Sequence, residues 1–278
     1  KQDYRYCNDD KWAKSMFDYC KIKNSKASDF KYRVLTCSLG EMVCSIRFVG
    51  GDMSKPAVFI LHKDFALEKI TDIRTVGHFL KEEYQNFSPK RIRWFFPKNG
   101  NELITSDKRI KGDLVYIAGF LSDIKSNTTF SLKEEVQLHE TTSLDWFPKY
   151  QSAYQQMIIN DPSYAEMGEM TTKETFQDLM KQNLVFEIKI NNEWAGIIAA
   201  SQENHHYYIG YEIYEEFLLN SYRGKGYAST TQRLLIEKMN AAKNNMLWGT
   251  IHYDNIASLK TAMKNGRKEC GIYIFYTI

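Results

Sequence analysis

The sequence predicts a mixed α/β (α+β) protein of two domains, and three observations lead to this prediction. The chain has 278 residues, and domains average roughly 150 residues. Hydrophobic residues make up 43% of the chain and charged residues 26%, the proportions of an ordinary globular protein. Apolar residues recur at helical spacing in some segments and form short continuous or alternating runs in others, so helices and strands are expected in both halves.

Composition and charge exclude several classes of protein. No stretch approaches the ~18 consecutive apolar residues of a membrane-spanning helix, and residues 1–5 lack the apolar core of a secretory signal. The net charge of +3 comes from 37 basic and 34 acidic residues, without the dense basic stripe of a nucleic-acid-binding protein. We therefore expect neither a membrane nor a nucleic acid as a partner.

The cysteines predict a reducing compartment. Their odd number and irregular spacing indicate free thiols instead of a disulfide framework, which is typical of a cytoplasmic protein. No CxxC pair occurs, so we expect no metal site. The abundance of Lys, Asn and Ile hints at an AT-rich bacterial genome. The five cysteines are Cys7, Cys20, Cys37, Cys44 and Cys270.

The first half, residues 1–130, is predicted to be an accessory α/β domain. Apolar residues at helical spacing predict two helices, and short apolar runs predict five strands. Gly50-Gly51 predicts a turn, and the polar segment 123–131 is the best candidate for a linker. The predicted helices are 8–24 and 66–84, and the predicted strands are 32–38, 42–49, 57–61, 91–96 and 114–121.

The second half, residues 135–278, is predicted to be a separate domain. Its elements follow the order β-α-α-β-β-β-α-β-α-β, which indicates a mixed sheet with helices on its faces. Asn191-Asn192 predicts a hairpin between two of the strands. The predicted strands are 136–139, 184–190, 193–200, 206–219, 247–251 and 271–278, and the predicted helices are 145–160, 172–182, 228–240 and 256–264.

One segment of the second half has a pattern typical of anion binding. A predicted strand runs into a tight turn that contains Gly224 and Gly226, and a helix follows directly. Glycine allows the sharp turn and a close approach of a ligand, and the first N–H groups of the helix favour an anion such as a pyrophosphate. Arg223 and Lys225 add positive charge. The residues fit neither a P-loop nor GxGxxG, and the alternative interpretation is a basic surface turn.

Two motifs resemble one known family. Arg223-x-x-Gly226-x-Ala228 resembles the acetyl-CoA signature Q/R-x-x-G-x-G/A of the GNAT N-acetyltransferase superfamily. Asn255-x-x-Ser258, followed by Gly266, resembles the block that ends these domains. The resemblance covers residues 135–278 and implies the GNAT acyl-CoA N-acyltransferase fold there, with acetyl-CoA as cosubstrate. Residues 1–130 lack the signature, so they are either a degenerate copy of this fold or an unrelated accessory domain.

The resemblance also implies roles for individual residues. Asn255 would contact the pantetheine region and Ser258 would lie near the cofactor; the alternatives are a helix cap for Asn255 and a surface hydroxyl for Ser258. The pantetheine arm would bind the main chain of Phe217, Leu218 and Leu219, and the pyrophosphate would bind Arg223, Gly224, Lys225, Gly226, Tyr227 and Ala228.

Acetyl transfer to an amine needs a base and a donor for the developing oxyanion. An amine with a pKa of ~10.4 is neutral in about one molecule in 2500 at pH 7, so a general base helps. In relatives with a glutamate base, that residue lies about eleven positions before the signature, which is Glu212 here. Strand alternation predicts Glu212 and Glu216 on one face and Glu215 on the other, although a bulge near Phe217 would re-aim Glu216.

We rank Glu212 first and Glu216 second as the catalytic base; the alternative is that these are solvated carboxylates or ion-pair partners of Arg223 and Lys225. The backbone N–H of Leu218 is the candidate oxyanion donor. Many relatives carry a tyrosine, as general acid for the leaving thiolate, where this chain has Ala262. Here the thiolate either leaves without a protein acid or receives its proton from His252 or Tyr253.

We expect an N-acetyltransferase in which the amine attacks the thioester directly. The acceptor, a protein or a small molecule, cannot be read from the sequence. Two alternatives remain: use of another acyl-CoA, and a CoA-binding regulatory or interaction module without catalysis, to which Ala262 points.

Overall fold

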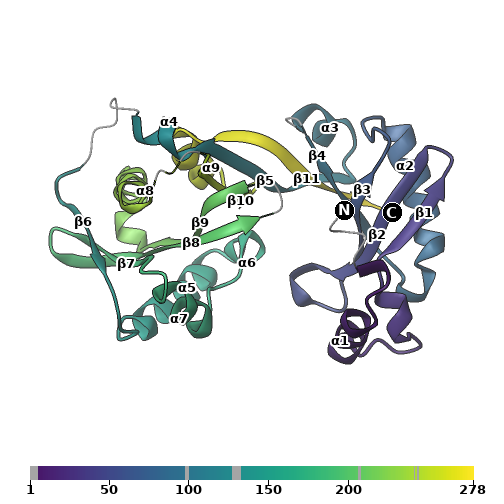
Figure 1. Cartoon of the computed structure of the whole chain (residues 1–278), viewed down its shortest axis with the longest axis horizontal. Coiled ribbons are helices and arrows are strands. Elements are labelled where there is room, and N and C mark those ends of the chain that lie inside the picture. Colours follow the sequence, from purple (N-terminus) through teal and green to yellow (C-terminus); the bar gives the residue numbers. More distant parts are fainter. Residues whose placement is uncertain (1–5, 98–99, 127–132, 206–207, 241, 243) are drawn as a thin grey trace. The chain divides into compact units, whose positions relative to one another are not determined.

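A computed structural model describes residues 6–97, 100–126, 133–205, 208–240, 242 and 244–278 of the chain. It divides into two compact units (Figure 1), unit 1 with Lys1–Val115 and Gly271–Ile278, and unit 2 with Tyr116–Cys270. The division lies inside a strand, whereas the sequence predicts a boundary in the segment 123–131. The start of that segment is not a linker, because residues up to Ser126 continue a short helix in which Leu121 and Ile124 are buried.

Unit 1 contains a sheet in which three antiparallel strands are followed by a parallel one. Strands β1, β2 and β3 pair antiparallel in this order, β3 pairs parallel with β4, and β4 pairs antiparallel with β11. The strands are β1 (Arg33–Cys37), β2 (Gly40–Phe48), β3 (Pro56–Lys63), β4 (Arg91–Phe96), β5 (Ile110–Phe120) and β11 (Lys268–Thr277), and the helices are α1 (Asp10–Cys20), α2 (Ile70–Glu83) and α3 (Asn101–Ser106).

Unit 2 repeats this arrangement with more strands. Its strands β6, β7, β8 and β9 pair antiparallel in this order, and β9 pairs parallel with β10. The strands are β6 (Val136–Glu140), β7 (Val185–Ile190), β8 (Glu193–His205), β9 (Tyr208–Leu218) and β10 (Met246–His252), and the helices are α4 (Leu121–Ser126), α5 (Phe147–Asn160), α6 (Tyr164–Met167), α7 (Lys173–Met180), α8 (Tyr227–Lys238) and α9 (Ile256–Lys264). Every predicted helix and strand has a counterpart, while α3, α4 and α6 were not predicted.

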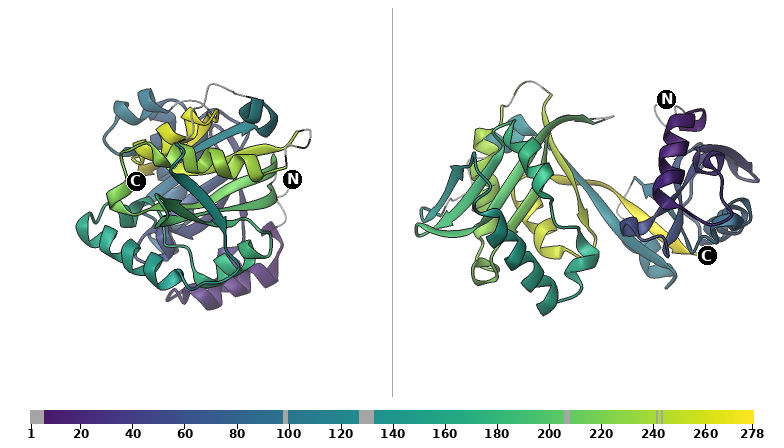
Figure 2. Two further views of the ribbon diagram at one scale, coloured as in Figure 1. Left: turned by 90° about the vertical axis from the view of Figure 1, so that its left-hand side faces the viewer. Right: turned by 90° about the horizontal axis from the view of Figure 1, so that it is seen from below.

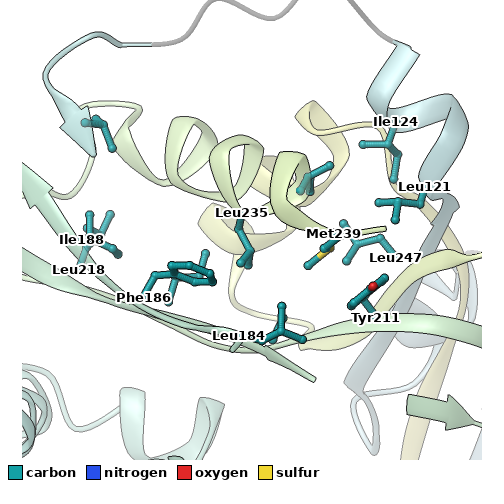
Figure 3. Close-up of a cluster of buried hydrophobic side chains, with 14 of the residues drawn as sticks. Leu121, Ile124, Leu184, Phe186, Ile188, Tyr211, Leu218, Leu235, Met239 and Leu247 are labelled. Atoms are coloured by element: carbon teal, nitrogen blue, oxygen red, sulfur yellow. The ribbon is translucent and has the colours of Figure 1, made fainter. Parts of the chain in front are cut away.

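Both faces of the unit 2 sheet are covered by helices. Along β8, Ile197 and Ala199 face one way and Ile198 and Ala200 the other, and all four are fully buried. Helices α5 and α7 cover the first face through an aromatic cluster around Tyr150. The second face is covered by helix α8 (Figure 2), and side chains of α8 and α4 join those of the strands in a mostly aliphatic cluster there (Figure 3). Both faces of the sheet therefore bury apolar side chains, and strand β9 contributes residues to each face. Among the described residues, no helix has the length and apolar character needed to cross a membrane.

The two units share the same order of elements. In each, three antiparallel strands lead into a helix and then into a strand parallel to the third, with α2 as the connection in unit 1 and α8 in unit 2. The third strand carries a bulge in both, at Leu61 of β3 and at Tyr214 of β9. This order supports the interpretation of unit 1 as a degenerate copy of the unit 2 fold.

The close approach of β8 to β9 depends on a glycine. A Cβ added at Gly196 would lie 1.9 Å from the carbonyl oxygen of Phe217, which is backbone and cannot move aside. We expect Gly196→Ala to destabilise the protein by about 3 kcal/mol, or roughly 6–12 °C in thermal unfolding. Gly168→Ala is the control, because a Cβ there meets nothing within 4 Å. Equal unfolding midpoints for the two variants would contradict this account of the strand pair.

Candidate functional site

Strands β9 and β10 pair only over a short stretch. The register joins Gly210 to Met246 and ends with Glu212 opposite Trp248, although β9 continues to Leu218. We call residues 213–218 the open edge of β9, because their main chain on the side away from β8 has no strand partner in the described part of the chain. The N–H of Leu219 donates to Ala195 of β8 at 2.8 Å. Since alternate residues point their N–H groups to opposite sides of a strand, the N–H of Leu218 faces the open edge.

A glycine turn connects the open edge to helix α8. Gly224 and Gly226 have φ values of +72° and +79°, in the left-handed region that favours glycine. Helix α8 begins directly afterwards, and no side chain caps its start, so the N–H groups of the first turn remain without an intrahelical partner. A Cβ at Gly224 would meet nothing within 4 Å. The turn therefore has the features of an anion site at a helix N-terminus.

The two basic residues of the turn differ in their surroundings. The Nε of Arg223 donates to the carbonyl oxygen of Leu218 at 2.8 Å, and its Nη2 donates to the Sδ of Met157 at 3.0 Å. The side chain of Lys225 is exposed. We therefore expect Lys225, not the guanidinium of Arg223, to supply the positive charge for an anion in the turn.

The second motif lies at the start of α9. Asn255 caps the helix, and its Oδ1 accepts from the backbone N–H of Ser258 at 3.2 Å, so the capping interpretation is confirmed. A contact of Asn255 or of the partly buried Ser258 with a cofactor stays a prediction. Ala262 is fully buried in the same helix.

A bulge decides which way the glutamates of β9 point. Glu215 pairs with Ala199 and Ile213 pairs with Ala200, so Tyr214 is the extra residue. The extra residue shifts the alternation by one position. Glu212 and Glu215 consequently share the face covered by α5 and α7, while Glu216 points to the α8 face. Alternation alone predicts Glu212 and Glu216 on one face, which is wrong. The bulge expected near Phe217 lies at Tyr214, and it turns Glu216 to the other face.

The surroundings of Glu212 favour the protonated form of its carboxyl. It is partly buried and lies beside Ser201 of β8 and Trp248 of β10 in the strand registers. Burial, and secondarily the negative charge of Glu203, raises the pKa of Glu212 to about 7. A carboxylate with this pKa both accepts a proton readily and is ionised in a large fraction of molecules at pH 7.

Glu215 forms hydrogen bonds with helix α5 and with the residues just before α7. Its Oε2 accepts from the hydroxyl of Tyr150 at 2.7 Å and from the Oγ1 of Thr171 at 2.9 Å. Burial raises the pKa of Glu215. Sequence reasoning missed Tyr150 and Thr171 as partners, since nothing in their local pattern relates them to a residue more than 40 positions away.

Glu216 belongs to a buried polar cluster on the α8 face. Its Oε2 accepts from the Nε2 of Gln232 at 2.6 Å, and the Oε1 of Gln232 accepts from the Nη2 of Arg267 at 2.7 Å. Arg267 is 4% exposed. Burial, which outweighs the hydrogen bond from Gln232 and the attraction of Arg267, raises the pKa of Glu216 to about 7. Glu216 is therefore on the opposite face of the sheet from Glu212, and nothing in the sequence predicted its contact with Gln232 and Arg267.

The raised pKa of Glu216 makes stability depend on pH. A carboxyl whose pKa is about 7 when folded and 4.5 when unfolded contributes stability that is fully present below about pH 4.5 and is lost as the pH rises through about 7. Glu216→Gln imitates the neutral form. We expect its thermal stability relative to the parent protein to improve by up to about 3 kcal/mol between pH 4.5 and pH 8. A constant difference over this range would contradict the assignment.

The remaining candidate groups have local roles. The Nδ1 of His252 accepts from the backbone N–H of Asp254 at 3.2 Å. Cys270 is exposed, and its thiol lies 3.5 Å from the carbonyl oxygen of Lys268. In the described ranges, no three His, Cys, Asp or Glu side chains gather as metal ligands do.

Comparisons with known proteins relate this site to one family. The family model described as "Acetyltransferase (GNAT) family" matches residues 143–266, which include the open edge and the glycine turn. No curated protein sequence matches the chain.

Similar solved structures cover most of the chain. An acetyltransferase of the GNAT family from Colwellia psychrerythraea is 12% identical with a TM-score of 0.55, and the match covers 95% of each chain. A GCN5-related N-acetyltransferase from Sphaerobacter thermophilus is 9% identical with a TM-score of 0.53, covering 92% of this chain and 82% of that one. A GCN5-related glucosamine N-acetyltransferase region of a fungal multi-domain GH3 beta-N-acetylglucosaminidase is 13% identical with a TM-score of 0.51, covering 99% of this chain and 37% of that one. At these identities the likeness concerns the fold, and it extends through unit 1.

Proposed function

We propose that the protein is an acetyl-CoA-dependent N-acetyltransferase, because the GNAT acetyltransferase family model matches residues 143–266. The acetyl group passes from the thioester to a primary amine of a protein or a small molecule. The observation that carries the proposal is the junction of two features: the open edge of β9 ends where the glycine turn and the uncapped start of α8 begin.

The residues at this junction fit coenzyme A. The N–H groups at the start of α8, together with Lys225, suit a pyrophosphate. The Cβ-free positions Gly224 and Gly226 leave room for its close approach. The main chain of β9 at Leu218 suits an amide-bearing arm, which would take the place of the missing strand partner.

Two groups of the chain would carry the chemistry. Glu212 accepts the proton that the amine must lose, directly or through a water molecule. The N–H of Leu218 donates to the thioester carbonyl oxygen, where negative charge develops as the amine attacks; one such donor is worth roughly 3 kcal/mol. The C–N bond forms as the C–S bond breaks. Since a thiol with a pKa of ~8.5 is a fair leaving group, the reaction proceeds with Ala262 in place of a protein acid.

Turnover is tested by measuring thiol release from acetyl-CoA with and without candidate amines. The proposal predicts release that depends on the amine, with one acetylated product per thiol. Thermal stabilisation by coenzyme A without turnover on any amine would favour a CoA-binding regulatory module. Release from a longer acyl-CoA, but not from acetyl-CoA, would favour another acyl donor.

A further inference from the structure

The segment 161–171, between α5 and α7, is fastened at three points. Thr171 donates through its Oγ1 to Glu215 at 2.9 Å and through its backbone N–H to the hydroxyl of Tyr150 at 3.1 Å. The hydroxyl of Tyr154 donates to the carbonyl oxygen of Gly168 at 3.1 Å. Near the start of the segment, the ring of Tyr164 lies beneath the guanidinium of Arg223, 5.4 Å from the ring centroid. The contacts at Thr171 and Gly168 thus join the segment to β9 and α5, and the contact at Tyr164 joins it to Arg223 in the glycine turn.

Arg223 connects two parts of unit 2 that are far apart in the sequence. On one side, its Nε donates to the carbonyl oxygen of Leu218, and its guanidinium lies 5.4 Å from the ring of Phe217. On the other side, its Nη2 donates to the Sδ of Met157, and the same guanidinium covers Tyr164. A planar guanidinium can donate in several directions while it stacks on rings, which a lysine ammonium cannot do.

The segment lies on the side of the sheet where an acceptor would bind. Thr171 contacts Glu215, and Glu215 shares its face of β9 with Glu212. An amine that gives its proton to Glu212 from this face therefore approaches past the segment. The guanidinium of Arg223 is thus in contact both with this segment and with the end of the open edge, at Leu218.

We propose that Arg223 is a positioning residue that couples the glycine turn to the segment 161–171, so that coenzyme A in the turn favours the acceptor-binding arrangement. This inference rests on the proposed function. Coupling between two sites is reciprocal, and typical values change affinity by 5- to 150-fold.

Hydrogen exchange of residues 157–171 tests the coupling without turnover. In the parent protein, coenzyme A should slow exchange in this segment. In Arg223→Met, exchange should be faster without ligand, and coenzyme A at a saturating concentration should no longer slow it. Arg223→Lys should resemble Arg223→Met, because the ammonium cannot bridge both sides. Once an acceptor is known, its KM should rise about tenfold in both variants.

Lys225→Met is the matched control, since it removes a charge from the same turn without touching the segment. It should weaken coenzyme A binding and leave exchange of the free protein unchanged. The inference is overturned if Arg223→Met leaves exchange of the segment as in the parent protein, or if it loses coenzyme A to the same degree as Lys225→Met with no change in exchange. Failure of the parent protein to bind coenzyme A would instead overturn the proposed function. Exchange of the ligand-free parent protein and of the ligand-free Arg223→Met variant would still show whether Arg223 holds the segment.

Discussion

Replacing Glu212 with glutamine should lower the turnover number about 100- to 1000-fold while the affinity for coenzyme A stays the same. The amide has nearly the same shape as the carboxyl but cannot accept the proton of the attacking amine, and a positioned general base contributes typically 10²- to 10⁴-fold. Steady-state rates with a saturating amine, together with calorimetric titration of coenzyme A, measure the two quantities separately.

The pH dependence of the same reaction identifies the group. Burial and the charge of Glu203 raise the pKa of Glu212 to about 7. Because the ionised carboxylate is the active form, the rate should rise with pH through about 7 and then level off, and Glu212→Gln should lack this rise. Glu203→Gln is the matched control: it removes the repelling charge, so the rise should move to lower pH with turnover retained. Full turnover in Glu212→Gln would remove Glu212 from the mechanism.

Gly226→Asp should weaken coenzyme A binding about 100-fold. Aspartate tolerates the left-handed conformation better than most residues, so the φ of +79° is compatible with folding. Its carboxylate would lie at the start of α8, where the pyrophosphate is expected. Two like charges about 4 Å apart near a protein surface repel by roughly 4 kcal/mol before screening by salt, and 2.7 kcal/mol corresponds to about 100-fold.

Gly226→Asn separates charge from shape. Asparagine is isosteric with aspartate and also tolerates the left-handed region, so its loss of affinity should stay within about tenfold. Both variants should unfold close to the temperature of the parent protein, since a Cβ at this position approaches only the flexible end of Lys133. Equal affinities for the aspartate and asparagine variants would show that no anion binds at this turn.

The local part of the site could be predicted from the sequence. Gly224 and Gly226 between a strand and a helix predict a tight turn at a helix start, and the structure has this turn directly before α8. Such features depend on neighbouring residues alone. The resemblance to a family added which ligand to expect, which the turn by itself does not specify.

The pattern of β9 alone does not give the arrangement of the glutamates. Alternation along a strand assumes an uninterrupted ladder, whereas the bulge at Tyr214 arises from pairing with β8. A bulge near Phe217 was expected, but its exact position, which places Glu212 and Glu215 on one face, depends on that pairing. The contacts of Glu216 with Gln232 and of Gln232 with Arg267 likewise join residues brought together only by the packing of α8 on the sheet.

The extent of the units also depends on long-range pairing. β11 was expected to complete the second domain, yet its residues from Gly271 onward belong to unit 1, where they pair with β4. A strand's hydrophobic pattern shows that it is buried but not which neighbour it pairs with.

Calorimetric titration of coenzyme A into the intact chain tests the central claim most directly. The open edge of β9 and the turn at Gly226 occur together once in the described residues, in unit 2, so the account predicts saturable binding of one molecule per chain. The absence of any binding heat across buffers and temperatures, with the protein folded, would contradict it.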